Sequence, residues 1–553
     1  MIRAAIVRSF ALGCCSWLAL AAPCLRAADE APLDAAESRL REVLSAKLEF
    51  APFVFGGEAL PGCEFEDPAR LRELIGPYTI KSTYHDRAGR RVEVAEAAGP
   101  YRVVAEVVPE SGRPLRRMAT LFKTSVPLDH DWHFAGDRPA ALLQLVCLGS
   151  SLPYVDLVGD QLKGRSYAEF SRDPAVARLL AGLSMIEVGD LPLRNAQDAV
   201  TLDRQAWVDL KRRLDGLDRA YPRPFVGPRR IEGEPAPVLR VGTLAEAGFR
   251  PGAVEGIDAI CRAWAADSDQ AFAVCIARHG VIVLHNAYGA RDGRPMTVDT
   301  TSWMASVTKA MSATLMMMLV DRGLVDLDAP VETYLPAFRG VAASGPLTVR
   351  HLYTHTGGLD RWPGWADELA DVEDRVAAAR PLLKVGGRWA YNGLGNTLGS
   401  KIVENLTGEA LPLSFRNHLL GPLGCTNTEV YGSHADARSI PLDMAKFGQM
   451  LLNGGAYGSW RFFSPETFKA MLPERLTKVL GPDAAKVFGI GLDGRPERFG
   501  HGAASTAMFS VDRLNDLVVI ITRNKDGRNW ERYQGRFTDA VRAGLEPPFR
   551  ESP

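Results

Sequence analysis

One long apolar segment stands out in the second half of the chain. Its sequence, AMSATLMMMLVDRG, covers residues 310–323 and places apolar side chains on nearly every side of a helix. Helices of that kind lie in the interior of a protein, whereas a surface helix keeps one polar face. A glycine such as Gly323 is typical just past a helix end. The pattern therefore predicts a central buried helix that begins near Ser306 and ends around Gly323.

Strand-like segments lie on both sides of this predicted helix. Residues 270–289 form two alternating segments around a turn at His279 and Gly280. Further strand-like runs occur at 488–494, 504–512 and 516–524, and a helical segment at 529–545 closes the chain. Strands at both ends with helices between them predict an α+β fold, in which an antiparallel sheet is flanked by helices and a helical subdomain is inserted in the middle.

A second, smaller domain is expected before this region. Its strand-like runs are at 101–109 and 118–127, and its helical runs are at 67–75 and 174–183. This mixture predicts a small α+β N-terminal domain over residues 28–220, to which the sequence assigns no chemistry. Residues 221–240 are rich in proline, glycine and charge, which predicts a linker or a strap on the surface. The main domain then covers residues 241–548.

The first 27 residues have the pattern of an export signal. Arg3 and Arg8 precede an apolar stretch at 9–22, and small residues allow cleavage after Ala21 or Ala27. Fourteen apolar residues are fewer than the roughly 20 that a spanning helix needs. We therefore expect an exported protein, periplasmic or secreted, with its signal peptide removed and no stable membrane insertion.

Composition excludes several classes of partner. The 553 residues have 46% hydrophobic and 24% charged content and a net charge of −1, which is ordinary for a globular protein. No basic run or stripe is present, so no nucleic-acid partner is expected. Protein partners are not indicated by any segment, and the expected partner is a small-molecule substrate.

Cysteine and histidine patterns give little support for a metal or a disulfide framework. Cleavage after residue 27 leaves five scattered cysteines without a CxxC pair, at 63, 147, 261, 275 and 425. His130 and His133 lie with two aspartates in DHDWHF, but no matching cluster follows, so a solvated loop is favoured over a metal site. We expect no metal and no cofactor.

Ser306 and Lys309 lie three residues apart where the polar segment changes into the apolar helix. On a helix they share one face. The buried start of a helix favours negative charge on a serine oxygen and disfavours a nearby ammonium, so Lys309 could act as a base for Ser306. Ser-Lys pairs are a known form of activated serine. The alternative is that Ser306 caps the helix while Lys309 reaches solvent.

Four segments around this pair resemble the serine β-lactamase and penicillin-binding superfamily, in its class C-like branch. They are residues 295–338, which contain Ser306, LTVRHLYTHTGGLD at 347–360, residues 439–467, and FGHGAASTAMFSVDRLNDLVVIITRN at 499–524. The resemblance covers about residues 255–545 in the family's order and implies a β-lactamase/transpeptidase-like fold. That branch also contains D-alanyl-D-alanine peptidases and carboxylesterases.

The resemblance assigns further site residues. Tyr391 occupies the tyrosine of the Y-x-N motif and is implied as the partner base. Gly393 replaces the motif's asparagine, and Asn392 is one position away, from which a loop could still bring it to the substrate. The absence of that asparagine weakens the case for penicillins and cell-wall peptides.

The family's third motif aligns with His501, Gly502 and Ala503, which are implied to bind the substrate. The backbone N–H groups of Ser306 and Ala504 are implied to form the oxyanion hole, which needs no particular side chain. Gly502 lacks the hydroxyl that helps relatives to bind a carboxylate. An unperturbed histidine at 501 has a pKa near 6.5, so we expect it to hold a carboxylate better at acidic pH.

Three other active-site patterns are not matched. His351 and His355 have the spacing of zinc ligands, but Leu352 stands where HExxH has its glutamate. No GxSxG motif is present, which argues against an α/β-hydrolase, and no glycine-rich phosphate loop follows a strand.

The sequence thus predicts an exported serine hydrolase that forms an acyl-enzyme at Ser306, with neutral esters or small amides as substrates. One alternative is a D-alanyl-D-alanine peptidase or β-lactamase. Another is a catalytically degenerate binding or sensor protein of the same fold, which the departures at Gly393 and Ala503 would favour and which the intact Ser306, Lys309 and Tyr391 argue against.

Overall fold

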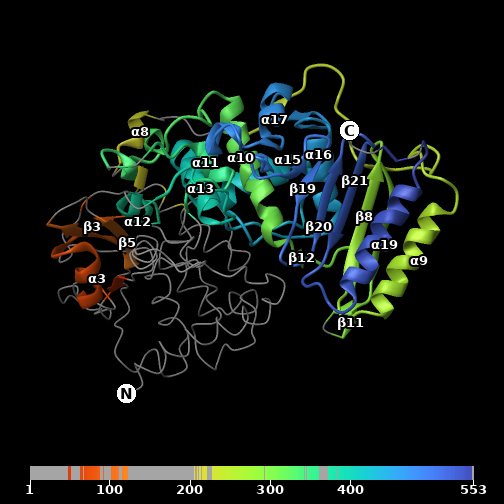
Figure 1. Ribbon diagram of the computed structural model, residues 1–553, viewed down its shortest axis with the longest axis horizontal. Helices are drawn as coiled ribbons and strands as arrows, with labels where there is room; N and C mark the ends of the chain where they lie inside the picture. Colours follow the sequence, from red (N-terminus) through yellow and green to blue (C-terminus); the bar gives the residue numbers. More distant parts are fainter. Residues whose placement is uncertain are drawn as a thin grey trace.

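The computed structural model describes two parts of the chain, which are shown in Figure 1. The described residues are 48–50, 63–65, 68–86, 91, 101–110, 115–121, scattered positions between 205 and 220, and 227–550 except 292, 342, 344, 360–371, 381–382 and 548. The predicted signal segment at 1–27, the residues His130 and His133, and the predicted helix at 174–183 lie outside the described residues.

The C-terminal part, residues 227–550, which contains the predicted active site and is called the catalytic part below, is built on a sheet of seven strands. In sheet order these are β18 (Asp493–Arg495), β19 (Arg498–His501), β20 (Met508–Asp512), β21 (Leu517–Thr522), β8 (Phe272–Arg278), β9 (Val281–Tyr288) and β7 (Arg240–Val241). Neighbouring strands from β18 to β9 pair in antiparallel fashion, so the predicted antiparallel sheet is confirmed. The turn at His279 and Gly280 joins β8 to β9, and both of its residues have positive φ.

One edge of the sheet differs from the prediction. The two-residue strand β7 pairs in parallel with β9, and the Arg240 N–H donates to the carbonyl of Gly280 over 2.9 Å. A hairpin forces its strands to be antiparallel, but β7 enters from a distant segment and is free of that constraint. The strand run predicted at 488–494 is also interrupted, because β17 (Val487–Phe488) and β18 are separate strands in different sheets.

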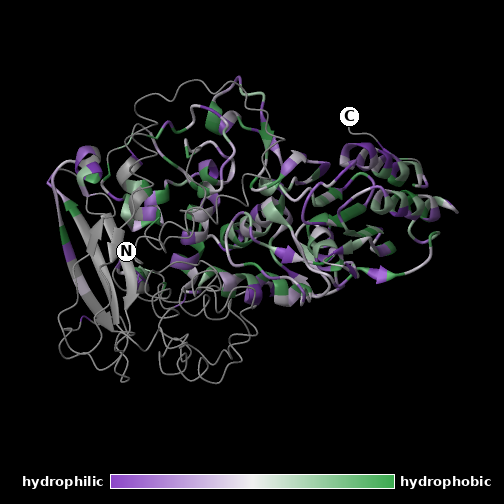
Figure 2. Cartoon of the chain, turned by 90° about the horizontal axis from the view of Figure 1, so that it is seen from below, coloured by the Kyte–Doolittle hydropathy of each residue, from purple (hydrophilic) through white to green (hydrophobic). Residues whose placement is uncertain are grey.

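Helices cover both faces of the sheet, as predicted. In Figure 1, α9 (Ala253–Ala266) and α19 (Trp530–Ala543) lie together on one face. Both helices show hydrophilic and hydrophobic positions in Figure 2, as amphipathic helices do. Their apolar sides meet the sheet around Trp264, whose ring lies 4.7 Å from that of Phe272 and 6.1 Å from that of Tyr533. This core fixes the C-terminal helix against the first hairpin of the sheet.

The other face carries α10 (Thr308–Asp321) and α16 (Pro441–Leu452). Residues 308–319 of α10 are all buried, so the predicted central helix is confirmed. In the helical subdomain α10 contacts α13 (Leu394–Thr407), which in turn contacts α11 (Val349–Tyr353) and α12 (Val372–Ala379). The nucleophile segment therefore begins a helix that is held on all sides.

Residues 229–241, within the predicted linker, lie on the catalytic part as a strap. β6 (Arg229–Arg230) pairs with β15 (Trp460–Arg461), and the guanidinium of Arg230 lies 4.1 Å from the ring of Trp460. Further along, the Ala236 N–H donates to the carbonyl of Gly458 over 2.9 Å. These contacts leave the described strap little freedom to move as a flexible tether.

The helical positions between 205 and 220 are fastened to the same part. Lys211 forms ion pairs with Asp215 at 3.0 Å and with the buried Glu373 of α12 at 2.9 Å. Gln205 donates to the carbonyl of Gly408, beyond α13, over 2.8 Å. In the N-terminal region, α3 (Pro68–Ile75) and the antiparallel strands β3 (Tyr78–Asp86), β4 (Tyr101–Pro109) and β5 (Leu115–Leu121) are present. None of the described helices is both long and apolar enough to span a bilayer.

Candidate active site

Ser306 lies in a short turn directly before α10. The 3-10 turn η3 (Ala305–Val307) leads into the helix, so regular α-helix begins at Thr308. Ala305 has a φ of 44°, which is uncommon for a residue with a Cβ and is typical of strained turns at functional sites. The first N–H groups of a helix have no partner within it, and the dipole adds positive potential there. The turn thus places Ser306 where a developing negative charge is stabilised.

Lys309 extends back toward this serine from the interior. It is 2% exposed, which contradicts the alternative in which Lys309 reaches solvent. Its Nζ lies 3.3 Å from Ser306 Oγ and donates to the backbone carbonyl of His434 over 3.0 Å. The three-residue spacing therefore brings the amine into hydrogen-bonding distance of the hydroxyl, which is the geometry that a base for Ser306 requires.

Tyr391 completes this group from the loop that precedes α13. Its hydroxyl is hydrogen-bonded to Ser306, and its ring centroid lies 4.7 Å from Lys309 Nζ. The residue is 44% exposed, but desolvation of the hydroxyl raises its pKa to about 12, against the opposing effect of the hydrogen bond to Ser306. At neutral pH Tyr391 therefore carries its proton and can donate it.

The side chain of Asn392 is hydrogen-bonded within its own turn. Its Nδ2 donates to the carbonyl of Ala390 over 2.9 Å, and its Oδ1 accepts from the N–H of Gly395 over 2.9 Å. Both ends of the amide are thus used within the turn that begins α13, and a contact of Asn392 with the substrate stays a prediction. Asn392 lies one residue before Gly393, which occupies the position of the motif's asparagine.

The loop that carries Tyr391 is held by His355. The carbonyl of His355 accepts from the Ala390 N–H over 2.8 Å, and its Nδ1 accepts from the Asn392 N–H over 3.4 Å. Its ring packs at 4.5 Å from the ring of Tyr391. His355 is 1% exposed, and burial together with the charge of Lys309 lowers its pKa well below the usual value, so it is neutral. It acts in this structure as a support for Tyr391, a role that the sequence pattern did not reveal.

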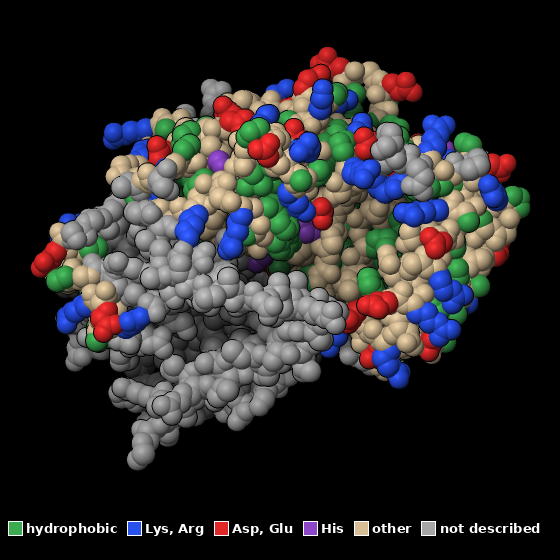
Figure 3. Space-filling view, in the orientation of Figure 1, with side chains coloured by type: hydrophobic (Ala, Val, Ile, Leu, Met, Phe, Trp, Pro, Cys, Tyr) green, Lys and Arg blue, Asp and Glu red, His purple; other side chains and the backbone are tan. Residues whose placement is uncertain are grey.

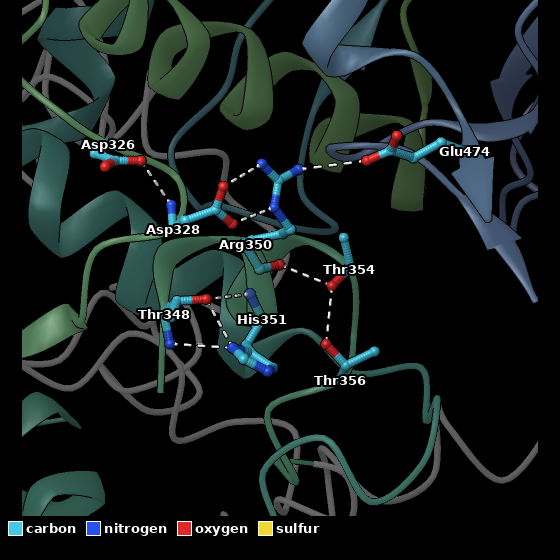
Figure 4. A network of polar contacts seen from close by, with 8 residues as sticks. All are labelled: Asp326, Asp328, Thr348, Arg350, His351, Thr354, Thr356 and Glu474. Atoms are coloured by element: carbon cyan, nitrogen blue, oxygen red, sulfur yellow. Dashed lines mark hydrogen bonds and ion pairs between the residues drawn. The ribbon is translucent and has the colours of Figure 1, made fainter. Parts of the chain in front are cut away.

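A polar network anchors the segment on which His355 lies (Figure 4). Arg350 of α11 bonds Asp328 through two nitrogens, at 2.6 and 2.9 Å, and lies 3.7 Å from Glu474. Thr348 and His351 form a capping box at the start of α11. These contacts fix the direction of α11 and thereby the backbone of the residues after it, which reach the Tyr391 loop. His351, one of the two histidines with zinc-like spacing, is used in the cap.

His501 is at the end of β19, next to η3. It is 7% exposed, and burial and the nearby Lys309 lower its pKa to about 4, although its hydrogen bond to the Gly502 carbonyl opposes this shift. The expectation of a pKa near 6.5 is therefore wrong, because the sequence could not show this burial. The neutral ring donates from Nδ1 to that carbonyl at 2.6 Å, which leaves Nε2 as an acceptor. Within the described part of the chain Nε2 has no hydrogen-bond partner.

The residues after His501 leave the backbone open. Gly502 is exposed, and a Cβ there would have nothing within 4 Å. Ala503 accepts from the Thr506 N–H over 2.8 Å in a tight turn that exposes Ala504. This arrangement is compatible with an oxyanion hole made from the N–H groups of Ser306 and Ala504, which stays a prediction. Among the described residues no cluster of three or more metal-binding side chains occurs.

On the face shown in Figure 3, charged side chains of both signs are interspersed among the described residues. A hydroxyl with an amine on one side and a protonated phenol on the other can attack a carbonyl and pass on its proton.

Part of the chain is similar to known proteins. A family model described as Beta-lactamase matches residues 258–543. Esterase EstB from Burkholderia gladioli is 35% identical over 191 residues, which cover 30% of this chain and 48% of EstB. Esterase/beta-lactamase LipL from Mycobacterium tuberculosis is 37% identical over 150 residues, which cover 26% of this chain and 34% of LipL.

A more extended match is to the D-alanyl-D-alanine-carboxypeptidase/endopeptidase AmpH from Escherichia coli, which is 24% identical over 283 residues, covering 41% of this chain and 72% of AmpH. The chain thus matches about half of the length of EstB and about a third of that of LipL.

The capping box of α11 gives a first testable prediction. Replacing Thr348 with alanine removes the hydroxyl that accepts from the His351 N–H, which should lower the free energy of unfolding by about 1 kcal/mol. Urea unfolding of the purified protein measures this change. Thr348→Ser keeps the hydroxyl and should retain most of the stability, so an equal loss in both variants would show that the cap is not the cause.

Proposed function

The chain belongs to the beta-lactamase family, and we propose that it is a serine hydrolase that forms an acyl-enzyme at Ser306 and acts on neutral esters or small amides. The observation that carries this proposal is the position of the Ser306 hydroxyl, which contacts both Lys309 Nζ at 3.3 Å and the hydroxyl of Tyr391. A site that had lost catalysis would have no reason to keep a lysine 2% exposed beside a serine.

The proposed reaction has two halves. Ser306 Oγ attacks the substrate carbonyl while its proton passes to Lys309, whose amine must be unprotonated at that moment. The N–H groups of Ser306 and Ala504 stabilise the oxyanion. Tyr391, which is protonated at neutral pH, donates to the departing alcohol or amine. Water then attacks the acyl-enzyme with the proton transfers reversed, which releases the acid and restores the serine. No cofactor takes part in these steps.

Three features support a neutral substrate. Gly393 and Gly502 present no side chain at positions that could hold an amide or a carboxylate. His501 is neutral and its Nε2 offers a lone pair, which repels a carboxylate. The names of EstB and LipL both include esterase activity, although they match this chain over only part of their length. We further propose that the protein is exported through its first 27 residues, from their charge and apolar pattern.

Ser306 should be the single site of covalent modification. A fluorophosphonate should add one label to the peptide that contains Ser306, as measured by intact-mass and peptide mass spectrometry. Ser306→Ala should abolish both the label and the hydrolysis of p-nitrophenyl acetate and butyrate. Ser459→Ala is a matched control in a surface turn and should retain both. Full turnover in the Ser306→Ala variant would refute the proposed function.

Lys309 and Tyr391 should behave as one catalytic unit. Lys309→Ala and Tyr391→Phe should each lower kcat/KM by at least about a hundredfold, because each removes a proton-transfer group. The double variant should lose little more than the worse single variant, since the two groups serve the same hydroxyl. Losses that multiply in the double variant would mean that the two side chains act independently.

The lowered pKa of His501 predicts how substrate preference depends on pH. The ring is protonated only below about pH 4, so it carries no charge at any higher pH used for assay. The ratio of kcat/KM for a carboxylate-bearing ester to that for its neutral analogue should therefore stay constant between about pH 5.5 and 8. His501→Lys should raise this ratio throughout that range. A ratio that rises in the native protein as the pH falls through about 6.5 would show that His501 titrates like an exposed histidine.

A further inference from the structure

The loop at residues 431–437 runs beside the nucleophile and is tightly fastened to it. The Met304 N–H donates to the carbonyl of Ala437 over 2.8 Å, and the Ala437 N–H donates to Thr308 Oγ1 over 3.0 Å. The indole N–H of Trp303 donates to the carbonyl of Ala435. These bonds join the loop to the residues on both sides of Ser306, so any side chain that the loop presents is held in a defined place.

His434 lies in the middle of this loop and contacts both catalytic segments. Its carbonyl accepts from Lys309 Nζ over 3.0 Å. Its ring lies against Gly393: a Cβ at residue 393 would be 2.5, 2.7 and 2.8 Å from three atoms of the imidazole. Real Cβ atoms do not approach other atoms so closely. A side chain at 393 and the ring of His434 therefore cannot occupy this place together.

We propose that His434 is a positioning and specificity-determining residue of the Ser306 site, whose ring fills the space beside the Tyr391 loop and whose carbonyl holds Lys309. This inference rests on the proposed function and deepens it. The ring is half-buried and packs against Gly393, two residues beyond Tyr391, while the carbonyl of the same residue holds the lysine next to Ser306. It thereby selects esters with compact acyl groups.

The ring of His434 thus fits in its place because residue 393 has no side chain. Adding a Cβ at 393 must displace the ring, and the ring belongs to the same residue whose carbonyl holds Lys309, so we expect the strain to reach that contact as well. Removing the ring instead leaves the carbonyl in place and opens a space of about the size of an imidazole. The two substitutions therefore have different and separable consequences.

A double-mutant cycle on the full-length protein tests this. Gly393→Ala should lower kcat/KM for p-nitrophenyl acetate by at least about tenfold, because a small misplacement of a catalytic group is costly. His434→Ala should raise the octanoate-to-acetate ratio of kcat/KM by about tenfold, since the acyl side has more room. The double variant should recover the activity of His434→Ala. Gly535→Ala, where an added Cβ has nothing within 4 Å, is the control substitution.

Melting temperatures of the same variants provide a second readout. Gly393→Ala should lower the melting temperature of the protein, and adding His434→Ala should reverse that loss, whether or not the variants are active. The proposal is overturned if Gly393→Ala behaves like the Gly535→Ala control, if the double variant is no better than Gly393→Ala alone, or if His434→Ala leaves the acyl-chain ratio unchanged. If the native protein hydrolyses no ester, the proposed function fails, whereas the melting temperatures still decide whether the ring and residue 393 compete for one space.

Discussion

Burial of the Lys309 amine is the constraint on which the rest of the catalytic part depends. A basic group in the interior is costly unless polar atoms surround it. Here Nζ lies within 3.3 Å of Ser306 Oγ and 3.0 Å of the His434 carbonyl, and the face of Tyr391 lies 4.7 Å away. These three partners come from a turn, a distant loop and the segment before α13. To satisfy one amine, the chain must bring all three segments together.

The rest of the fold keeps those segments from moving apart. α10 is buried along nearly its whole length between the sheet and the helical subdomain, so Lys309 cannot shift along it. On one side the Arg350 network fixes α11, which leads to His355 and the Tyr391 loop. The positive φ of Ala305 is a strained conformation that the surrounding contacts must maintain. Functional groups placed on rigid elements in this way need little reorganisation during reaction.

The sequence was sufficient to predict the helices and strands that have a clear apolar pattern. Apolar residues on all sides of 310–323 predicted α10, alternating segments at 270–289 predicted β8 and β9, and a strand-like run at 516–524 predicted β21. The spacing of Ser306 and Lys309 predicted their contact, since both lie at the start of one helix. The short parallel strand β7 has too few residues to show a period, and nothing local sets its direction.

What could not be predicted depends on contacts between distant segments. The lowered pKa of His501 follows from burial, which single residues in a sequence do not reveal. His434 lies in a loop without periodicity, 125 residues from the lysine that its carbonyl holds. The amide of Asn392 was expected to face the substrate, but its own turn offered both a donor and an acceptor close by. Short-range partners of this kind are the usual ones for asparagine in loops.

In the sequence, Gly393 is only the loss of the motif's asparagine side chain. In the structure, the same glycine makes room for the ring of His434. Read alone, the loss of a side chain there suggests decay of the site. A decaying site would be expected to release the buried lysine, since an unneeded buried polar group costs stability. Instead an imidazole fills the space, and its own backbone holds the lysine. The glycine and the histidine form one complementary contact, as in a site adapted to a different acyl group.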